Sequence, residues 1–368
     1  MFSNLPFTLK LVVIFQSAAL VATQSLWETD FSQSSPSKAL QMDDSTSVGY
    51  SASKVDEVVH MSADKKHLEI NFPKGSYSKT KAEGVVNAYV PPSTGGDFGE
   101  EATLSYSVKF QQGFDFNKGG KLPGFFAGAL EKGNSCSGGK SGKCFSSRIM
   151  WREKGDGEVY LYFQNHDSEA KEFCSRHKDD AVCSGMGVSI GRGKFTFVPG
   201  QEHQIQLYVK ANAAGQANGI VRLYFDGELV VEMDDVKWRA DQDIALSSVF
   251  FSSFFGGGDA SWASPKDQSL EIGAMQVEKG AAASGGKASS KKSMIRGEEK
   301  KNLSPAEEVK SSKEEVKSSE EVKSSKEEVK SSEEVKSSKK EEESSEDPLT
   351  DSKSSSKKAV SEKTRSTQ

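Results

Sequence analysis

The chain has 368 residues, of which 27% are charged, and it carries a formal net charge of −5 at pH 7. Such a mild negative charge excludes a global basic surface for nucleic acid, so a polyanionic partner would have to meet a local basic site. Beyond one N-terminal apolar stretch there is no long apolar run, and we expect no membrane span in the mature protein.

The N-terminus has the pattern of a secretory signal peptide over residues 1–24. Lys10 supplies a positive charge, residues 11–22 (LVVIFQSAALVA) form an apolar segment too short to cross a bilayer, and small residues follow for cleavage. An uncleaved anchor or a buried N-terminal segment is the alternative. We therefore expect a protein that is secreted to the extracellular space, and we expect it to be a monomer.

Residues 25–280 consist of short alternating apolar and polar stretches separated by Gly, Pro, Asn and Asp. The clearest candidate strands are 67–72, 102–110, 146–153, 158–164, 194–198, 203–211, 219–233 and 268–278. No apolar run of helical period exceeds two turns. Many short strands in one domain of about 250 residues predict an all-β fold, a β-jelly-roll sandwich whose concave sheet face carries a substrate groove.

Four cysteines lie close together in this region, which agrees with an oxidising compartment: Cys136, Cys144, Cys174 and Cys183. Three pairings are open to them. We expect the local disulfides Cys136–Cys144 and Cys174–Cys183, because each closes a short polar loop. A zinc site is the alternative, but the sequence has no CxxC pair.

The last segment, residues 281–368, consists almost entirely of Ser, Lys and Glu and repeats the unit EEVKSS. One valine per repeat leaves no second apolar position for a coiled-coil seam. Such a segment cannot bury enough apolar surface to offset the entropy of ordering it. The composition therefore predicts a disordered, charge-balanced tail.

Two neighbouring candidate strands carry polar side chains that alternation places together. In the stretch GEVYLYF, Tyr160 and Tyr162 are two residues apart and share a face. Ser146 and Arg148 share a face of the preceding strand in the same way. A turn at residues 154–157 can join the strands as a hairpin, so the four side chains can converge on one surface.

Upstream, residues 117–124 (NKGGKLPG) are predicted to form a Gly-rich loop with two lysines, without the Walker pattern of nucleotide sites. Arg, Lys and two Tyr make a poor glycoside hydrolase, because that reaction generally needs a pair of carboxylates. They suit β-elimination on a polyuronate. There, cations neutralise the C6 carboxylate, while tyrosines remove the C5 proton and protonate the departing oxygen.

Six sequence blocks in order are similar to polysaccharide lyase family 14, which includes alginate and glucuronan lyases with a β-jelly-roll fold. The blocks are FDFNKGGKLPG (114–124), FSSRIMWR (145–152), GEVYLYF (157–163), SIGRGKFTFVPGQEHQI (189–205), GQANGIVRLYFDGELV (215–230) and FFSSFFGGGDASWASPKDQ (250–268). The resemblance covers roughly residues 85–278. It implies a lyase that cleaves a 1,4-linked polyuronate, glucuronan or alginate, and leaves 4,5-unsaturated uronic acid ends.

The resemblance also implies a catalytic set, which falls on Lys121, Ser146, Arg148, Tyr160 and Tyr162. Lys121 and Arg148 would then neutralise the substrate carboxylate, and Ser146 would position the substrate. The two tyrosines would serve as base and acid, in an order that the sequence leaves open. The resemblance implies no catalytic metal, and we expect no cofactor; the expected partner is an acidic polysaccharide.

Further residues are candidates for contacting the sugar chain: Lys118, Trp262, Lys266, Asn218 and Arg222. An indole such as that of Trp262 suits stacking on a sugar ring, and packing within the loop is the alternative interpretation.

Simpler interpretations stand beside these assignments. Tyr160 and Tyr162 suit ordinary packing on an amphipathic strand, Arg148 can pair with Glu158 across the hairpin, and His166 falls in a stretch typical of a turn. For the whole protein, the alternatives are a non-catalytic, lectin-like carbohydrate-binding module and an extracellular matrix protein.

Overall fold

The computed structural model describes residues 24–42, 49–80, 83–131, 136, 142–184 and 186–280. Residues 1–23 of the expected signal peptide and the whole Ser/Lys/Glu-rich segment 281–368 lie outside the described residues. The expectations for those two segments stay predictions.

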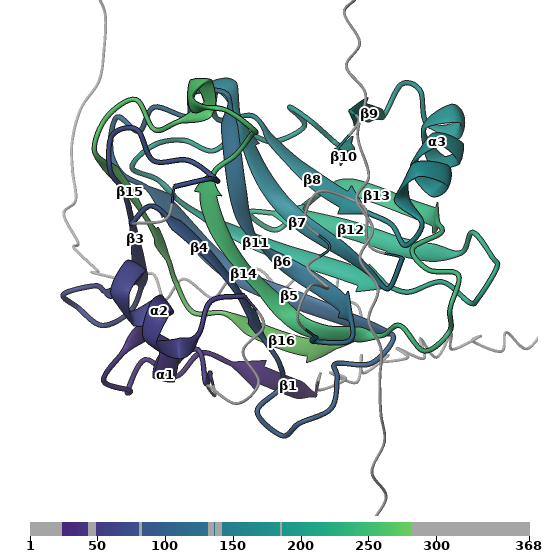
Figure 1. The fold of residues 1–368 in the computed structure, drawn as a ribbon, viewed down its shortest axis with the longest axis horizontal. Helices are drawn as coiled ribbons and strands as arrows, with labels where there is room; N and C mark the ends of the chain where they lie inside the picture. Colours follow the sequence, from purple (N-terminus) through teal and green to yellow (C-terminus); the bar gives the residue numbers. More distant parts are fainter. Residues whose placement is uncertain are drawn as a thin grey trace, which may run out of the picture. The chain divides into compact units, whose positions relative to one another are not determined.

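The described chain forms two antiparallel sheets (Figure 1). The nine-stranded sheet contains β1 (Ser25–Glu28), β2 (His60–Met61), β3 (Leu68–Phe72), β5 (Glu101–Phe110), β11 (Glu202–Lys210), β12 (Gly219–Phe225), β13 (Glu228–Val236), β15 (Gln268–Ile272) and β16 (Gln276–Lys279). The seven-stranded sheet has the order β4 (Val85–Val90), β14 (Leu246–Phe255), β6 (Gly119–Gly128), β7 (Cys144–Arg152), β8 (Gly157–Tyr162), β10 (Gly187–Ile190) and β9 (Ala181–Ser184). The all-β fold that the sequence predicts is therefore confirmed.

Aromatic rings from both sheets meet in one core between them. Phe72 of β3 and Phe110 of β5 contact Trp151 of β7 edge to face, with ring centroids 6.1 and 5.5 Å apart. Phe255 of β14 lies 5.3 Å from Phe72 in the same manner. Edge-to-face contacts of this kind add to the apolar burial that holds the two layers together. The other face of the seven-stranded sheet does not take part in this core.

The alternation predicted for β7 and β8 is confirmed. Ile149 and Leu161 belong to the core between the sheets, whereas Tyr160 belongs to a separate buried cluster on the opposite face. The strands pair antiparallel with Arg148 opposite Tyr160. Side chains directly opposite each other in such a pair lie on the same face. The register thus places the arginine and the tyrosine together.

The prediction of a Gly-rich loop over residues 117–124 is wrong from Gly119 onward, because these residues begin strand β6. Glycine serves close packing here rather than a mobile loop. A Cβ at Gly120 would lie 2.0 Å from the ring of Trp151, so no larger residue fits against the indole at this position.

A β-bulge in β6 decides where Lys121 points. Lys121 pairs with Met150 and Gly124 pairs with Arg148, so β6 has one residue more than β7 between these two pairs. Pro123 lies within the irregular stretch, where its missing N–H is tolerated. The extra residue changes the parity of the alternation. Lys121 therefore lies on the same face as Gly124 and Arg148.

Among the described residues, three α-helices accompany the sheets: α1 (Pro36–Ala39), α2 (Ala52–Val58) and α3 (His166–Arg176). The sequence predicts a turn where α3 begins, and this is wrong. The helix is hard to predict because only two of its residues, His166 and Phe173, are buried. Its sequence therefore lacks the apolar stripe that usually marks a helix. No helix among the described residues is long and apolar enough to cross a membrane.

Both expected disulfides are present, Cys136–Cys144 and Cys174–Cys183. The second joins the C-terminal turn of α3 to β9, at the edge of the seven-stranded sheet.

The strand predicted over residues 194–198 is wrong as well. Within it, Thr196 forms only an isolated bridge with Asp156. The alternation that suggested a strand is real, because Phe195 and Phe197 are both buried in the core. Their burial is achieved by an irregular segment that packs onto Phe225 of β12.

Candidate active site

All five predicted catalytic residues lie on the same face of the seven-stranded sheet, on three adjacent strands. β6 contributes Lys121, β7 contributes Ser146 and Arg148, and β8 contributes Tyr160 and Tyr162. We call this set of five the catalytic face. Its side chains pack against each other, so none is more than 7% exposed.

The basic and phenolic groups of the catalytic face are in direct contact. Lys121 Nζ lies 3.6 Å from the centre of the Tyr160 ring. The rings of Tyr160 and Tyr162 are perpendicular, with centroids 5.3 Å apart. Arg148 Cζ lies 5.8 Å from the Tyr162 ring. Cations this close to phenols stabilise negative charge that develops on the phenol or on a bound anion.

Arg148 is buried among groups that the sequence did not single out. Its guanidinium lies 4.3 Å from the ring of Phe250 and donates to the Ser252 hydroxyl at 3.3 Å. Burial lowers the pKa of Arg148, while the neighbouring tyrosines oppose the shift. The alternative pairing of Arg148 with Glu158 is wrong, because the carboxylate of Glu158 binds two other arginines.

Burial changes the acid–base character of Lys121. Desolvation lowers its pKa well below the ordinary value, the cations Arg148 and Arg152 lower it further, and Glu158 acts in the opposite direction. Its amine donates to the sulfur of Met150, which is a weak acceptor. A buried amine with such partners is held towards its neutral form.

Ser146 shares the face but its hydroxyl is already engaged. It is fully buried opposite Tyr162, and Oγ donates to the carbonyl of Cys136 at 3.4 Å. The serine thereby connects β7 to the Cys136–Cys144 disulfide. Ser146 lies within strand β7 and is not a turn residue.

Tyr89 of β4 belongs to a cluster of aromatic rings next to Arg148. Its ring stacks on Phe250 with centroids 4.4 Å apart and lies 4.9 Å from Phe126. Burial raises the pKa of Tyr89 to about 12, against the opposing influence of Arg148. The phenol therefore stays protonated at neutral pH. Residues 250 and 252 share one face of a strand by alternation, and this pattern in the sequence could have predicted that both contact Arg148.

His166 lies closer to the catalytic face than the sequence indicates. Its ring centroid is 5.3 Å from that of Tyr162, and Nδ1 accepts from the backbone N–H of Phe163 at 3.2 Å. Burial lowers the pKa of His166. A neutral imidazole that accepts at Nδ1 carries its proton on Nε2.

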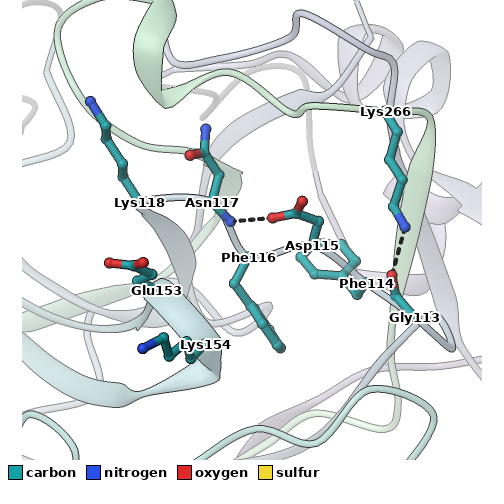
Figure 2. A pocket seen from close by; sticks show the side chains of 9 residues that line it. All are labelled: Gly113, Phe114, Asp115, Phe116, Asn117, Lys118, Glu153, Lys154 and Lys266. Atoms are coloured by element: carbon teal, nitrogen blue, oxygen red, sulfur yellow. Dashed lines mark hydrogen bonds between the residues drawn. The ribbon is translucent and has the colours of Figure 1, made fainter. Parts of the chain in front are cut away.

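Three of the expected substrate-contact residues gather at the start of β6 rather than on the catalytic face. The amine of Lys118 donates to Ser261 Oγ at 2.7 Å and lies 6.0 Å from the ring of Trp262. Lys266 donates to the carbonyl of Gly113 at 2.6 Å. Lys118 and Lys266 line a cavity of about 670 Å³, shown in Figure 2.

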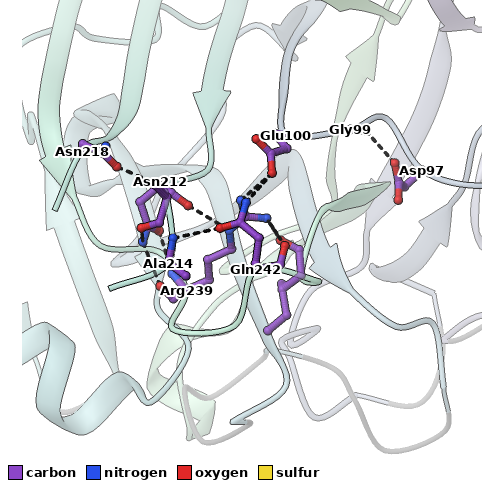
Figure 3. A network of polar contacts seen from close by, with 10 residues as sticks. Asp97, Gly99, Glu100, Asn212, Ala214, Asn218, Arg239 and Gln242 are labelled. Atoms are coloured by element: carbon purple, nitrogen blue, oxygen red, sulfur yellow. Dashed lines mark hydrogen bonds and ion pairs between the residues drawn. The ribbon is translucent and has the colours of Figure 1, made fainter. Parts of the chain in front are cut away.

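The structure places Asn218 and Arg222 away from the catalytic face, and their role as substrate contacts stays a prediction. Asn218 accepts from the backbone N–H of Ala213, beside the network around Arg239 in Figure 3. Arg222 lies in the nine-stranded sheet and pairs with Glu232 at 2.6 Å. Arg222 thus belongs to the sheet that does not carry the catalytic face, and Asn218 directly precedes its strand β12.

The family model for polysaccharide lyase 14 matches residues 60–275, more than half of the chain and almost all of its two sheets. The protein belongs to polysaccharide lyase family 14. It is therefore a polysaccharide lyase enzyme, and the purely carbohydrate-binding alternative is not favoured.

Solved structures agree with the membership in polysaccharide lyase family 14. The structure of the marine PL-14 alginate lyase from Aplysia kurodai is 31% identical, has a TM-score of 0.59, and covers 70% of this chain and 100% of its own. The alginate lyase Aly36B, at 20% identity and a TM-score of 0.50, covers 71% of this chain and 93% of its own and shows the shared fold alone. A comparison with curated protein sequences finds no match.

Proposed function

We propose that this lyase cleaves a 1,4-linked polyuronate, alginate or glucuronan, by β-elimination and leaves a 4,5-unsaturated uronic acid end. The observation that carries the proposal is the contact of two cations with two phenols on one sheet face. Lys121 lies 3.6 Å from the Tyr160 ring and Arg148 lies 5.8 Å from the Tyr162 ring. The similar Aplysia kurodai structure is of an alginate lyase, which supports alginate as the first polymer to test.

The groups on the catalytic face match the steps of the elimination. A base removes the C5 proton, the C4–O bond breaks as the C4–C5 double bond forms, and an acid protonates the departing oxygen. The guanidinium of Arg148 is suited to the C6 carboxylate, because its charge persists and its donors match carboxylate geometry. Tyr160 and Tyr162 supply the base and the acid in this proposal.

Lys121 is a second candidate for the base. The sequence suggested that Lys121 neutralises the carboxylate together with Arg148. Because burial holds the pKa of Lys121 well below its ordinary value, more of its amine is neutral and able to accept a proton than in a lysine in water. A tyrosine in contact with it would then serve as the acid.

The test is to incubate the protein with alginate and with glucuronan and to follow the ultraviolet absorbance of unsaturated ends. We expect product from at least one polymer. Replacing both phenols, Tyr160→Phe with Tyr162→Phe, should lower the rate by about a hundredfold or more, because general acid and base are both lost. Tyr224→Phe, on β12 of the other sheet, is the control and should leave the rate unchanged.

Two outcomes contradict the proposal. If neither alginate nor glucuronan gives unsaturated product, the proposed substrate is rejected. Full activity of the double tyrosine variant would reject the roles of the two phenols while leaving the lyase activity itself in place.

We further propose that the lyase acts outside the cell. The signal-like residues 1–24 and the two disulfides are compatible with an oxidising, extracellular compartment. In this proposal residues 25–280 form the lyase domain and 281–368 form a separate tail.

A further inference from the structure

Glu158 is a fully buried carboxylate on the same strand as the two tyrosines. It lies at 0% exposure, and alternation along β8 places it on the face of Tyr160 and Tyr162. Removing an ionised carboxylate from water is costly unless cations and hydrogen bonds compensate it. Glu158 therefore needs cationic and hydrogen-bonding partners around it.

Two arginines bind this one carboxylate. Arg152 Nε donates to Oε1 at 2.8 Å, and Arg192 Nε donates to Oε2 at 2.6 Å. The hydroxyl of Ser189 donates to Oε1 at 2.9 Å and accepts from both guanidinium groups. Both carboxylate oxygens are thus occupied. Two positive charges facing one negative charge leave one positive charge uncompensated.

No other acidic side chain in the described part of the chain forms an ion pair with either arginine. The next ionisable groups along this face, Lys121 and Arg148, are bases as well, and neither supplies a negative charge. The excess positive charge of the two arginines is therefore suited to an anion that comes from outside the protein.

Both guanidinium groups remain accessible although their carboxylate partner is not. The side chain of Arg192 is 36% exposed and that of Arg152 is 16% exposed, against 0% for Glu158. Nη1 of each arginine makes no hydrogen bond to the described residues. These nitrogens are donors that match a carboxylate.

The arginine pair continues the catalytic face. Arg152 is on the same side of β7 as Arg148, and its Cζ lies 5.8 Å from the ring of Tyr160. A polymer bound over the tyrosines reaches the pair without leaving this sheet.

The loop that carries Arg192 is built to hold it. Gly191 and Gly193 on either side have φ angles of +66° and +74°, a region that favours glycine. A Cβ at Gly191 would also lie 2.3 Å from Val231, so the backbone packs too closely there for another residue. The direction of Arg192 is therefore set by its neighbours.

We propose that Arg152 and Arg192 form a second carboxylate subsite, which binds a uronate of the same polymer next to the residue being cleaved. The inference rests on the proposed function and goes beyond it, because it assigns recognition of the chain to residues that take no part in bond breaking. Glu158 and Ser189 position the two arginines and do not contact the substrate.

The test compares Arg192→Gln and Arg192→Lys with Arg176→Gln. Arg176 is a matched control, because it is similarly exposed and pairs with the carboxylate of Asp235 in the nine-stranded sheet. We expect Arg192→Gln to raise KM for the polymer about tenfold with kcat nearly unchanged, the effect of one lost charge-assisted contact. Arg192→Lys should recover part of the loss, and Arg176→Gln should match the wild type.

High salt supplies a second readout, since screening should reduce the difference between Arg192→Gln and wild type. The subsite is rejected if Arg192→Gln lowers only the melting temperature and keeps the wild-type KM. If Arg192→Gln does not fold, the KM of Arg192→Lys decides, and a wild-type value rejects the subsite.

Failure of the proposed function gives a different result. In that case the wild type itself makes no unsaturated product, and retention on an immobilised uronan replaces KM. Weaker retention of Arg192→Gln than of Arg176→Gln would then still support the subsite, and equal retention would reject it.

Discussion

Burial separates the chemistry of Lys121 from that of Lys118, although both lie in the same short Gly- and Lys-rich segment. Lys118 is exposed and donates to a serine hydroxyl near Trp262. Lys121 is 7% exposed, lies over the Tyr160 ring and has a strongly lowered pKa. The amine of Lys118 is held at the surface, whereas burial makes the amine of Lys121 easier to deprotonate than that of a lysine in water.

Replacing Lys121 by arginine tests whether its neutral form is needed. The neutral fraction of Lys121 grows as pH rises through its lowered pKa, so we expect kcat/KM of the wild type to rise with pH on the way to 10.5, the ordinary value. Lys121→Arg carries a permanent charge and should lose about a hundredfold or more of the activity at every pH. A pH–rate profile of both proteins provides the measurement.

The opposite pattern would return Lys121 to the role suggested by the sequence. If Lys121 neutralises the substrate carboxylate, the wild-type rate falls as pH rises through this pKa. Lys121→Arg would then keep a substantial part of the activity.

Among the elements, β6 shows how one irregularity positions a functional group. Its bulge between Leu122 and Gly124 lets Lys121 and Gly124 face the same side, where regular alternation would separate them. Gly124 is needed for the close approach to β7, since a Cβ there would lie 2.0 Å from the carbonyl oxygen of Ser147. That neighbour is backbone and cannot turn away.

Gly124→Ala should therefore lower the free energy of unfolding by about 1–3 kcal/mol, the usual cost of overpacking. Urea denaturation measures the change. Gly258→Ala is the control, because a Cβ at Gly258 meets nothing within 4 Å. Equal stability of the two variants would mean that β6 and β7 separate at little cost, and the bulge would not fix Lys121.

At the scale of the whole molecule, both sheets and the catalytic face lie between Ser25 and Lys279. The Aplysia kurodai structure is covered over its full length by 70% of this chain. The described part of the chain is thus long enough for the family fold.

A chain truncated after Gly280 should keep kcat/KM on a soluble uronan within about twofold of the full chain, because the catalytic face and the whole family match, residues 60–275, precede the cut. Product absorbance gives the rate, and retention on insoluble polymer gives a separate measure of adhesion. A large loss of activity in solution would show that residues 281–368 take part in catalysis.

The sequence alone determined the two-residue alternation of β7 and β8 and the local disulfide pairing, because these depend on near neighbours in the chain. It therefore placed Tyr160 with Tyr162, and Ser146 with Arg148, on common faces. It did not predict α3, whose buried side is too narrow to leave an apolar period.

Only the tertiary structure decided which distant groups share the catalytic face. The bulge in β6 moved Lys121 onto it, and the separation of the sheets removed Arg222 from it. The partners of Glu158 became known only when β8 paired with β10, which brings in Ser189 and the loop of Arg192. Register and burial are set by strands far apart in sequence, and burial in turn sets the charge state of each group.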